Sequence, residues 1–239
     1  MWQEPLDCVK GFEVAYERIG RSIAAYESSA EVNPFTSKYD YYLAGMEKLT
    51  DEEQSGLLLF NGKAMCSLCH ISGSDEEGVP NGEPPLFTDF SYDNLGVPRN
   101  PDNPFYTQPP SRNPDGADWV DYGLGGFLMN AGYPEEHYTP ELGKVKVPTL
   151  RNVDLRPYPG FVKAYMHNGV FKSLEEVVHF YNTRDVPGEG WEGESWAAPE
   201  VPDNVNEDEL GNLDLSADEE AAIVAFLKTL SDGYVLPKE

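Results

Sequence analysis

The sequence predicts a mainly α-helical domain in which a few short helices are joined by long ordered loops. Apolar residues recur at three- and four-residue intervals in several segments, which is the spacing of a helix face that packs on a core. The chain also contains 22 glycines and 20 prolines among its 239 residues, and these residue types are typical of ordered turns. Little sheet is expected, because extended structure is indicated only for residues 144–161.

Four segments carry the helical pattern, and three of them begin with an N-terminal capping pair. Residues 11–28 place apolar side chains at helical spacing. The letters TDEE at residues 50–53 match a capping box, in which each side chain accepts a hydrogen bond from the other residue's backbone N–H. The helix that follows is expected to end at Gly62. Ser173 and Ser216 are each followed three residues later by Glu, so two further helices are expected to begin there with the same box.

The segments between these helices are predicted as loops. They are a turn-rich connector at residues 33–45, a mostly irregular run at 71–118, a short turn or helical piece at 121–132 and an acidic loop at 184–214. Long irregular runs in a compact protein are usually functional or are held in place by a cofactor. Residues 1–48 are expected to form an N-terminal helix and connector that pack on a domain formed by residues 49–239.

The chain carries a formal net charge of −25. Such a charge repels a polyanion, so nucleic acid binding is excluded as a function. Two interpretations of the charge stay open: solubility in a salty or extracellular setting, and steering of a basic partner protein. No stretch approaches the ~20 apolar residues that cross a membrane, so no membrane span is expected.

The pattern C-x-x-C-H at Cys66, Cys69 and His70 is typical of covalent haem attachment. Two thiols at this spacing each form a thioether to a vinyl group on one edge of a porphyrin, and the adjacent histidine then binds the iron. A thioredoxin-like site needs a strand before the motif, and a zinc site needs a second ligand pair; a helix is expected before this motif, and the other histidines have no cysteine nearby. The sequence therefore predicts one covalent haem c, with His70 as the proximal ligand, in a cytochrome c-like helical domain.

Haem c is attached on the oxidising, outer side of the bacterial inner membrane. The protein is therefore expected in the periplasm or outside the cell. The first 20 residues lack the basic and apolar regions of a signal peptide, and we expect such a segment to have been removed. Cys8, the third cysteine, is interpreted as a small hydrophobic residue or a free thiol.

Several segments resemble, in the same order, the C-terminal haem domain of the bacterial di-haem cytochrome c peroxidases and MauG-type enzymes. They are RIGRSIAAYESS, DYYLAG, GLLLFNGKAMCSLCH, PLFTDFSYDNLGVPRNP, GLGGFL, VPTLRNV, YMHNGVFKSLEEVVHFYNTRD and IVAFLKTL. The resemblance covers nearly the whole chain, from residue 11 to residue 231. The succession of VPTLRNV, MHNG and SLEEVV is far more specific than C-x-x-C-H alone.

Members of this family have two haem domains, and the N-terminal one carries the haem that meets peroxide. This chain contains a single C-x-x-C-H motif. The resemblance therefore implies electron transfer through a c-type haem, together with a redox partner protein. The alternative is a hydrogen-peroxide-dependent peroxidase or oxidase that acts with a second haem domain or subunit. That second domain would lie on another chain or have been cut away; a genuine single-haem relative is the remaining interpretation.

The resemblance also implies which residue binds the far side of the iron. The family's distal ligand lies in the helix after SLEEVV, where classical peroxidases have Met and MauG-type proteins have Tyr; its equivalent here is Tyr181. The helical spacing agrees, because Val177, Val178 and Tyr181 share one face. The alternatives are Met166 as the ligand, an open or water-bound position, and Tyr181 as a core aromatic residue with a hydrogen-bonded hydroxyl.

Two further residues are expected near the haem. His167 matches a family histidine at the haem edge, where it would bond to a propionate or to water. Arg151 is expected either to pair with a propionate through its guanidinium group or to fix a loop by hydrogen bonds. His179 points away from the Tyr181 face and is expected on the solvent side. The family often holds calcium between its domains, but the stretch PGFVKAYMHNG has an altered lead-in, so calcium is not predicted.

Overall fold

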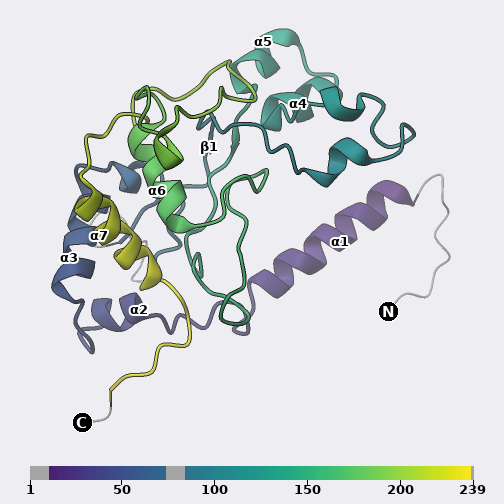
Figure 1. Ribbon diagram of the computed structural model, residues 1–239. Coiled ribbons are helices and arrows are strands. Elements are labelled where there is room, and N and C mark those ends of the chain that lie inside the picture. Colours follow the sequence, from purple (N-terminus) through teal and green to yellow (C-terminus); the bar gives the residue numbers. More distant parts are fainter. Residues whose placement is uncertain (1–10, 74–83, 238–239) are drawn as a thin grey trace. The chain divides into compact units, whose positions relative to one another are not determined.

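The computed structural model describes residues 11–73 and 84–237 (Figure 1). The chain divides into two compact units, Met1–Thr36 and Ser37–Glu239. In the first unit, α1 (Phe12–Glu27) confirms the helix predicted for residues 11–28. Cys8 lies outside the described residues. The large apolar side chains along α1 that are exposed are Phe12, Val14, Tyr16, Ile19, Ile23 and Tyr26.

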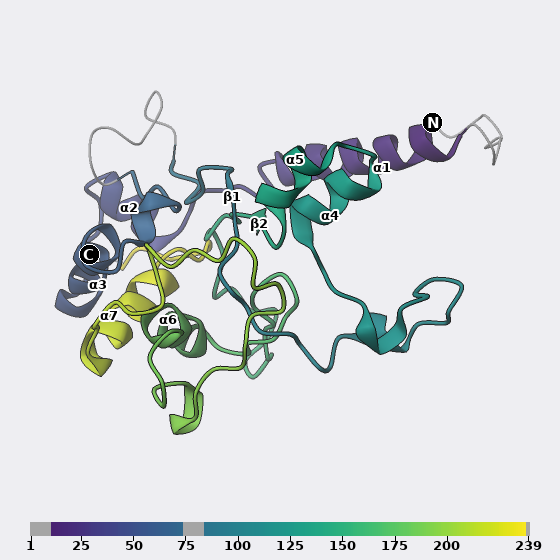
Figure 2. The same ribbon diagram turned by 90° about the horizontal axis from the view of Figure 1, so that it is seen from above.

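Four helices of the second unit supply most of its core. They are α2 (Lys38–Leu43), α3 (Asp51–Asn61), α6 (Leu174–Thr183) and α7 (Ala217–Lys228). The helices α3 and α7 lie side by side in both views (Figure 1, Figure 2). A Cβ atom at Gly56 of α3 would lie 1.9 Å from the backbone oxygen of Ala222. Glycine at this position therefore permits the close approach of the two helices.

Capping pairs explain where these helices begin, with one correction to the prediction. Both reciprocal bonds of the capping box are present at Thr50 of α3 and at Ser216 of α7. At α6, the Ser173 hydroxyl accepts a hydrogen bond from the N–H of Glu176 at 3.1 Å. The Glu176 carboxylate, however, accepts from the N–H of Lys172 at 2.8 Å. The reciprocal box predicted at Ser173 is therefore wrong, because the carboxylate caps the residue before the N-cap.

The connector predicted at residues 33–45 contains a helix, α2, that the sequence analysis did not assign. Its N-terminus is capped by Ser37 and Asp40, which form a complete capping box. Tyr39 of this helix is fully buried in the core of the second unit. The chain from Ser37 onward therefore belongs structurally with the helical domain. The packing of residues 1–48 as a separate segment on the domain 49–239 stays a prediction.

Strand structure is limited to one small antiparallel pair among the described residues. The strands β1 (Tyr92–Asp93) and β2 (Val145–Lys146) place Asp93 opposite Val145. Residues 144–161 were predicted as extended, and β2 is the part of them that is strand. The rest forms turns, because this segment is interrupted by prolines, which lack the N–H group that a strand ladder uses.

The loops contain several short helical pieces. The stretch predicted as a turn or helix at residues 121–132 includes α4 (Gly123–Asn130). The others are α5 (Glu135–Tyr138) and the 3-10 turns η1 (Cys66–Leu68), η3 (Pro104–Thr107), η4 (Gly116–Asp118), η5 (Thr139–Glu141) and η6 (Trp191–Gly193).

Aromatic rings form the centre of the core. Tyr39, Phe60, Phe87 and Phe226 are at most 1% exposed, and their ring centroids lie 5.2 to 6.3 Å apart. Burying each such ring contributes about 1.5–3 kcal/mol relative to leaving it in water. Because Phe60 belongs to α3 and Phe87 to the following loop, this cluster fixes both chain segments that flank residues 66–70.

The predicted mainly helical fold with long ordered loops is confirmed. Within the described part of the chain, no helix combines the length and the apolar character that crossing a membrane requires.

Candidate haem site

The C-x-x-C-H segment begins directly after α3. The chain leaves the helix at Gly62, and Met65 adopts a left-handed backbone conformation with φ of 55°. The chain then forms the turn η1, across which the N–H of His70 donates to the backbone oxygen of Cys66 at 2.9 Å. This turn brings the side chains of Cys66, Cys69 and His70 to the wall of one cavity.

Two adjoining cavities lie beside this turn. Both are lined by Ala64, Cys66, His70 and Tyr181, so they are parts of one site. Aliphatic side chains form most of the remaining wall: Leu95, Val145, Val147, Leu150, Val177, Val178, Leu210, Leu213, Leu215, Ile223 and Leu227.

His70 is held in the form that binds a metal. Its Nδ1 atom lies 2.8 Å from the backbone oxygen of Phe87, and a carbonyl oxygen only accepts, so Nδ1 carries the proton. Burial lowers the pKa of His70 below its ordinary value, against smaller opposing effects from Phe87, Asp89 and Pro148. The imidazole is therefore neutral at pH 7, with its lone pair on Nε2. This orientation by a backbone carbonyl is the usual support of a metal-binding histidine.

The cysteines of the motif are free, protonated thiols. Burial raises the pKa of Cys66 to about 12. Burial and the neighbouring carboxylates of Glu209, Asp89 and Asp93 raise the pKa of Cys69 to about 11. Both sulfurs therefore carry their protons at neutral pH in the absence of a metal ion. Both suit thioether formation, in which an S–H group adds across a vinyl double bond.

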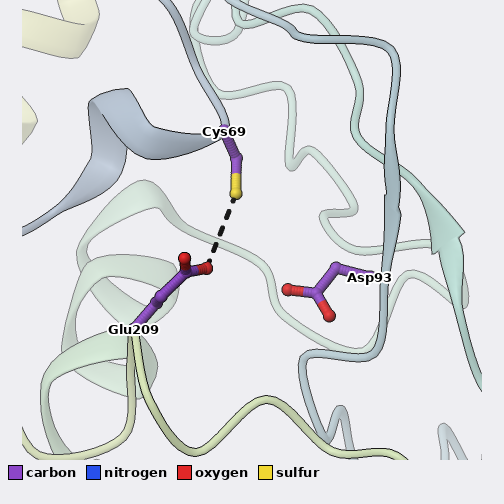
Figure 3. A group of neighbouring side chains, drawn as sticks. All are labelled: Cys69, Asp93 and Glu209. Carbon is purple, nitrogen blue, oxygen red and sulfur yellow. Dashed lines mark hydrogen bonds between the residues drawn. The ribbon is translucent and has the colours of Figure 1, made fainter.

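Cys69 lies beside two carboxylates that the sequence analysis did not single out, Asp93 and Glu209 (Figure 3). The Sγ atom of Cys69 is 3.9 Å from Oε2 of Glu209. The side-chain amide of Asn206 donates to Asp93 at 2.6 Å and to Glu209 at 2.8 Å, which holds both carboxylates in place. Cys69, Asp93 and Glu209 all line the cavity beside His70, so we assign this group to the wall of the candidate haem site.

Tyr181 of α6 also lines both cavities. Burial raises the pKa of its phenol well above the ordinary value, with smaller contributions from Cys66, Cys69 and Asp93. Among the described residues, the hydroxyl has no hydrogen-bond partner, and its backbone oxygen accepts from the N–H of Gly211 at 2.7 Å. A phenol that faces a cavity without such a partner fits a position next to a ligand better than ordinary core packing.

The other residues singled out from the sequence do not line these cavities. Met166 packs at the edge of the core, and His167 is exposed. The guanidinium group of Arg151 donates to both carboxylate oxygens of Asp40 at 2.7 Å and to the backbone oxygen of Pro85 at 2.9 Å. Arg151 therefore acts as a loop-fixing donor, which was one of its two expected roles. Contacts of Arg151 and His167 with a haem stay predictions.

The residues of the cavity fit a c-type haem. Two neutral thiols three positions apart, a neutral imidazole beside them and a phenol with no hydrogen-bond partner are gathered on largely aliphatic walls. The thiols suit attachment to the porphyrin, and the imidazole and the phenol suit binding to the iron. The aliphatic walls suit the exclusion of water. No signal in the sequence pointed to the Phe87 carbonyl or to the two carboxylates, because the loops that bring them here leave no periodic pattern.

Comparisons with known proteins show which proteins this chain resembles. No protein-family profile matches the chain. It is 35% identical over 231 residues to the methylamine utilization protein MauG of Paracoccus denitrificans, which covers 94% of this chain and 54% of that protein. It is 32% identical over 243 residues to the cytochrome-c peroxidase IdrP2 of a Pseudomonas species, which covers 100% of this chain and 54% of that protein. The crystal structure of the diheme peroxidase BthA from Burkholderia thailandensis matches with a TM-score of 0.68 at 33% identity, covering 90% of this chain and 52% of that chain.

The chain belongs to the bacterial di-haem cytochrome c peroxidase and MauG family. This confirms the family resemblance inferred from the sequence. The chain spans about half the length of the curated relatives it matches. Its correspondence to the C-terminal half of the di-haem peroxidases stays a prediction. Haem is the cofactor of this family, and the cavity beside Cys66 and His70 is a site in the described part of the chain that fits it.

Proposed function

We propose that this chain is a periplasmic domain that carries electrons through one covalent haem c. Cys66 and Cys69 would hold the porphyrin by thioether bonds, while His70 and Tyr181 would bind the iron. The observation that carries the proposal is that these four side chains line a single apolar site. Membership of a family of di-haem redox proteins supports it.

The residues of this site would set how the haem behaves. A bound haem supplies an iron that changes between Fe(III) and Fe(II) by one electron. The Phe87 carbonyl keeps Nε2 of His70 available, and the aliphatic walls exclude water. Tyr181 would lose its phenolic proton on binding, because the charge of the metal replaces that of the proton. A phenolate and the carboxylates of Asp93 and Glu209 add negative charge, which favours Fe(III).

The proposed compartment and partner follow from the same chemistry. Thioether attachment of haem takes place outside the inner membrane, which supports a periplasmic or extracellular location. A net charge of −25 supports a basic redox partner, because opposite charges accelerate protein association. The identity of the electron donor and of the acceptor is left open by these observations.

Peroxide-dependent oxidation is the second candidate function. It is favoured by the names of the relatives, which include cytochrome-c peroxidases and a diheme peroxidase. This chain spans about half the length of the curated relatives. The peroxide reaction would therefore need either an exchangeable sixth ligand on this haem or a second haem domain, on this protein or on a partner. In that arrangement the haem of this chain would store or relay oxidising equivalents.

Haem content and spin state test these two functions. The chain is expressed with the haem c maturation system, and a pyridine haemochrome assay gives the number of haems per chain. We expect one covalent haem with a six-coordinate ferric spectrum that cyanide and peroxide leave unchanged. A high-spin ferric band that shifts on adding peroxide would favour the second function. Protein that folds and matures without haem would contradict both.

A further inference from the structure

A hollow in the surface lies beside α6, on the side that His179 faces. It is formed by His179, by Glu220 of α7 and by the loop at residues 188–193. Three carboxylates line it, those of Glu189, Glu192 and Glu220, and the described lining residues include no lysine or arginine. Trp191 is 42% exposed in this hollow. The hollow therefore presents a partly exposed indole ring among carboxylates.

The loop that presents Trp191 is held in a defined shape. A Cβ atom at Gly190 would lie 2.2 Å from the backbone oxygen of Glu194, so this position needs glycine. The N–H of Gly188 donates to the Ser195 hydroxyl at 2.8 Å. Glu192 adopts a left-handed conformation with φ of 64°, which is costly for a residue other than glycine. The ring of Trp191 is therefore displayed by a structured turn.

Glu220 and His179 form the fixed floor of the hollow. Nδ1 of His179 lies 2.9 Å from Oε1 of Glu220, and the Asn182 amide donates to the same oxygen at 2.6 Å. His179 was expected on the solvent side, but the structure shows it half-buried between α7 and two tryptophan rings. The Glu220 carboxylate therefore keeps its position without help from a ligand.

A chain of ring contacts connects this hollow with the candidate haem site. The centroid of Trp191 lies 5.8 Å from that of His179, and His179 lies 6.1 Å from Trp196. Trp196 lies 5.1 Å from Phe180, and Phe180 lies 6.5 Å from Tyr181. Tyr181 lines the haem cavity. Packed rings without water between them support electron tunnelling better than a solvated gap of the same length.

We propose that this hollow is the docking site for a basic redox protein that exchanges one electron with the haem. A lysine or arginine of the partner would lie over the Trp191 indole, where the ring face attracts a cation, between the carboxylates of Glu189 and Glu192. When the iron is ferric, the partner's redox centre loses one electron and the iron gains it, with no bond formed or broken. This inference rests on the proposed electron-transfer function.

Binding is tested with the haem-loaded chain and zinc-substituted cytochrome c, a basic protein, as the probe. The variant Glu189→Gln/Glu192→Gln removes two charges from the hollow, and Glu135→Gln/Glu136→Gln removes two exposed charges from α5 as the matched control. We expect the hollow variant to weaken binding about tenfold at low salt, and the control variant to weaken it less than about twofold. Equal weakening by both variants, or by neither, would overturn the proposal.

The indole is tested by Trp191→Ala and Trp191→Phe in the same assay. Losing the ring should weaken binding about fivefold, and phenylalanine should restore part of that loss. Light excites the zinc porphyrin, which passes one electron to the ferric haem, so flash photolysis gives the transfer rate inside the complex. We expect this rate to fall in the alanine variant. Binding that needs Trp191 but does not change with salt would show an apolar occupant instead of a basic one.

Two measurements separate failure of this inference from failure of the proposed function. Haem content and reduction of the haem by a small uncharged reductant are recorded for every variant. If these are normal while binding is unaffected in the hollow variants, only the docking site is wrong. If no haem is incorporated, or if the small reductant does not reduce the haem, the proposed function is wrong.

Discussion

Nδ1 of His70 donates a hydrogen bond to the backbone oxygen of Phe87 at 2.8 Å. This contact joins the C-x-x-C-H turn to a residue of the aromatic core, and it fixes which nitrogen of His70 has a free lone pair. The core cluster, which is fully buried at Phe87, therefore sets the orientation of the proposed iron ligand. Because a backbone atom of Phe87 accepts this bond, a substitution of the Phe87 side chain disturbs the aromatic core but keeps the acceptor that fixes the tautomer of His70.

Covalent attachment of the haem is the first prediction. Replacing Cys66 and Cys69 together by alanine should prevent attachment, because no other described cysteine lines the cavity. Each single replacement should leave one thioether and shift the pyridine haemochrome band toward that of a porphyrin with one free vinyl group. Mass spectrometry of the denatured protein and acid–acetone extraction measure both effects. Haem that extracts cleanly from the unaltered chain would contradict the c-type assignment.

The carboxylates beside Cys69 should lower the reduction potential of the haem. Each carboxylate adds a negative charge to the wall of the haem site, which stabilises Fe(III) relative to Fe(II). A stabilisation of about 1 kcal/mol corresponds to roughly 40 mV for one electron. The variants Asp93→Asn and Glu209→Gln should therefore each raise the potential by tens of millivolts. Asp208→Asn is the control, because Asp208 is exposed next to this site. Redox titration measures these shifts. If the potential shifts equally in all three variants, Asp93 and Glu209 have no greater effect on the haem than an exposed carboxylate.

The buried ion pair of Arg151 and Asp40 predicts how stability depends on pH. Burial raises the pKa of Asp40, but hydrogen bonds from Arg151 and Ser37 and the charge of Arg151 outweigh it, so the pKa is lowered from its ordinary value of 3.8. A carboxyl with a lowered pKa in the folded state contributes stability above its unfolded pKa. This contribution is therefore complete above the unfolded-state pKa of about 3.8. It is lost as the pH falls from there through the lower pKa of the folded state.

The variant Asp40→Asn should lose that acid-dependent contribution. It also leaves the Arg151 guanidinium, 6% exposed, without its carboxylate, which costs about 3–5 kcal/mol. Urea unfolding of the haem-loaded chain between pH 7 and pH 3 measures both effects. The double variant Asp40→Asn/Arg151→Met should recover part of the stability at pH 7, and Asp102→Asn serves as an exposed control. A stability curve that falls in parallel for all variants would show that other carboxyl groups dominate.

The features that were predictable from the sequence are those that depend on residues close together in the chain. The helix boundaries at Thr50 and Ser216 follow from residues three positions apart, and the C-x-x-C-H motif is local in the same sense. The helix α2 was missed because its box uses Asp40, a shorter side chain than the usual Glu or Gln at that position. The partner of Arg151 and the carboxylates beside Cys69 were not predictable, because they depend on how distant loops meet. The choice between the two expected roles of Arg151 needed the position of Asp40.

The last prediction concerns Tyr181, whose hydroxyl has no hydrogen-bond partner among the described residues of the cavity it lines. A phenolate on the iron favours Fe(III), so Tyr181→Phe should open that position and raise the reduction potential. A rise of about 100 mV corresponds to about 2.3 kcal/mol for one electron. The ferric spectrum should change at the same time to a high-spin or water-bound form.

Two further variants decide whether the phenol itself is the ligand. Tyr181→Met should give a low-spin haem of higher potential, provided the thioether reaches the iron, because a Met ligand favours Fe(II) more than a phenolate does. Met166→Leu is the matched control, since Met166 packs at the edge of the core and does not line the cavity. If Tyr181→Phe leaves spectrum and potential unchanged while Met166→Leu alters both, the thioether of Met166 is the distal ligand. If neither variant changes them, the distal position is open or holds water, and Tyr181 serves to pack the wall of the cavity.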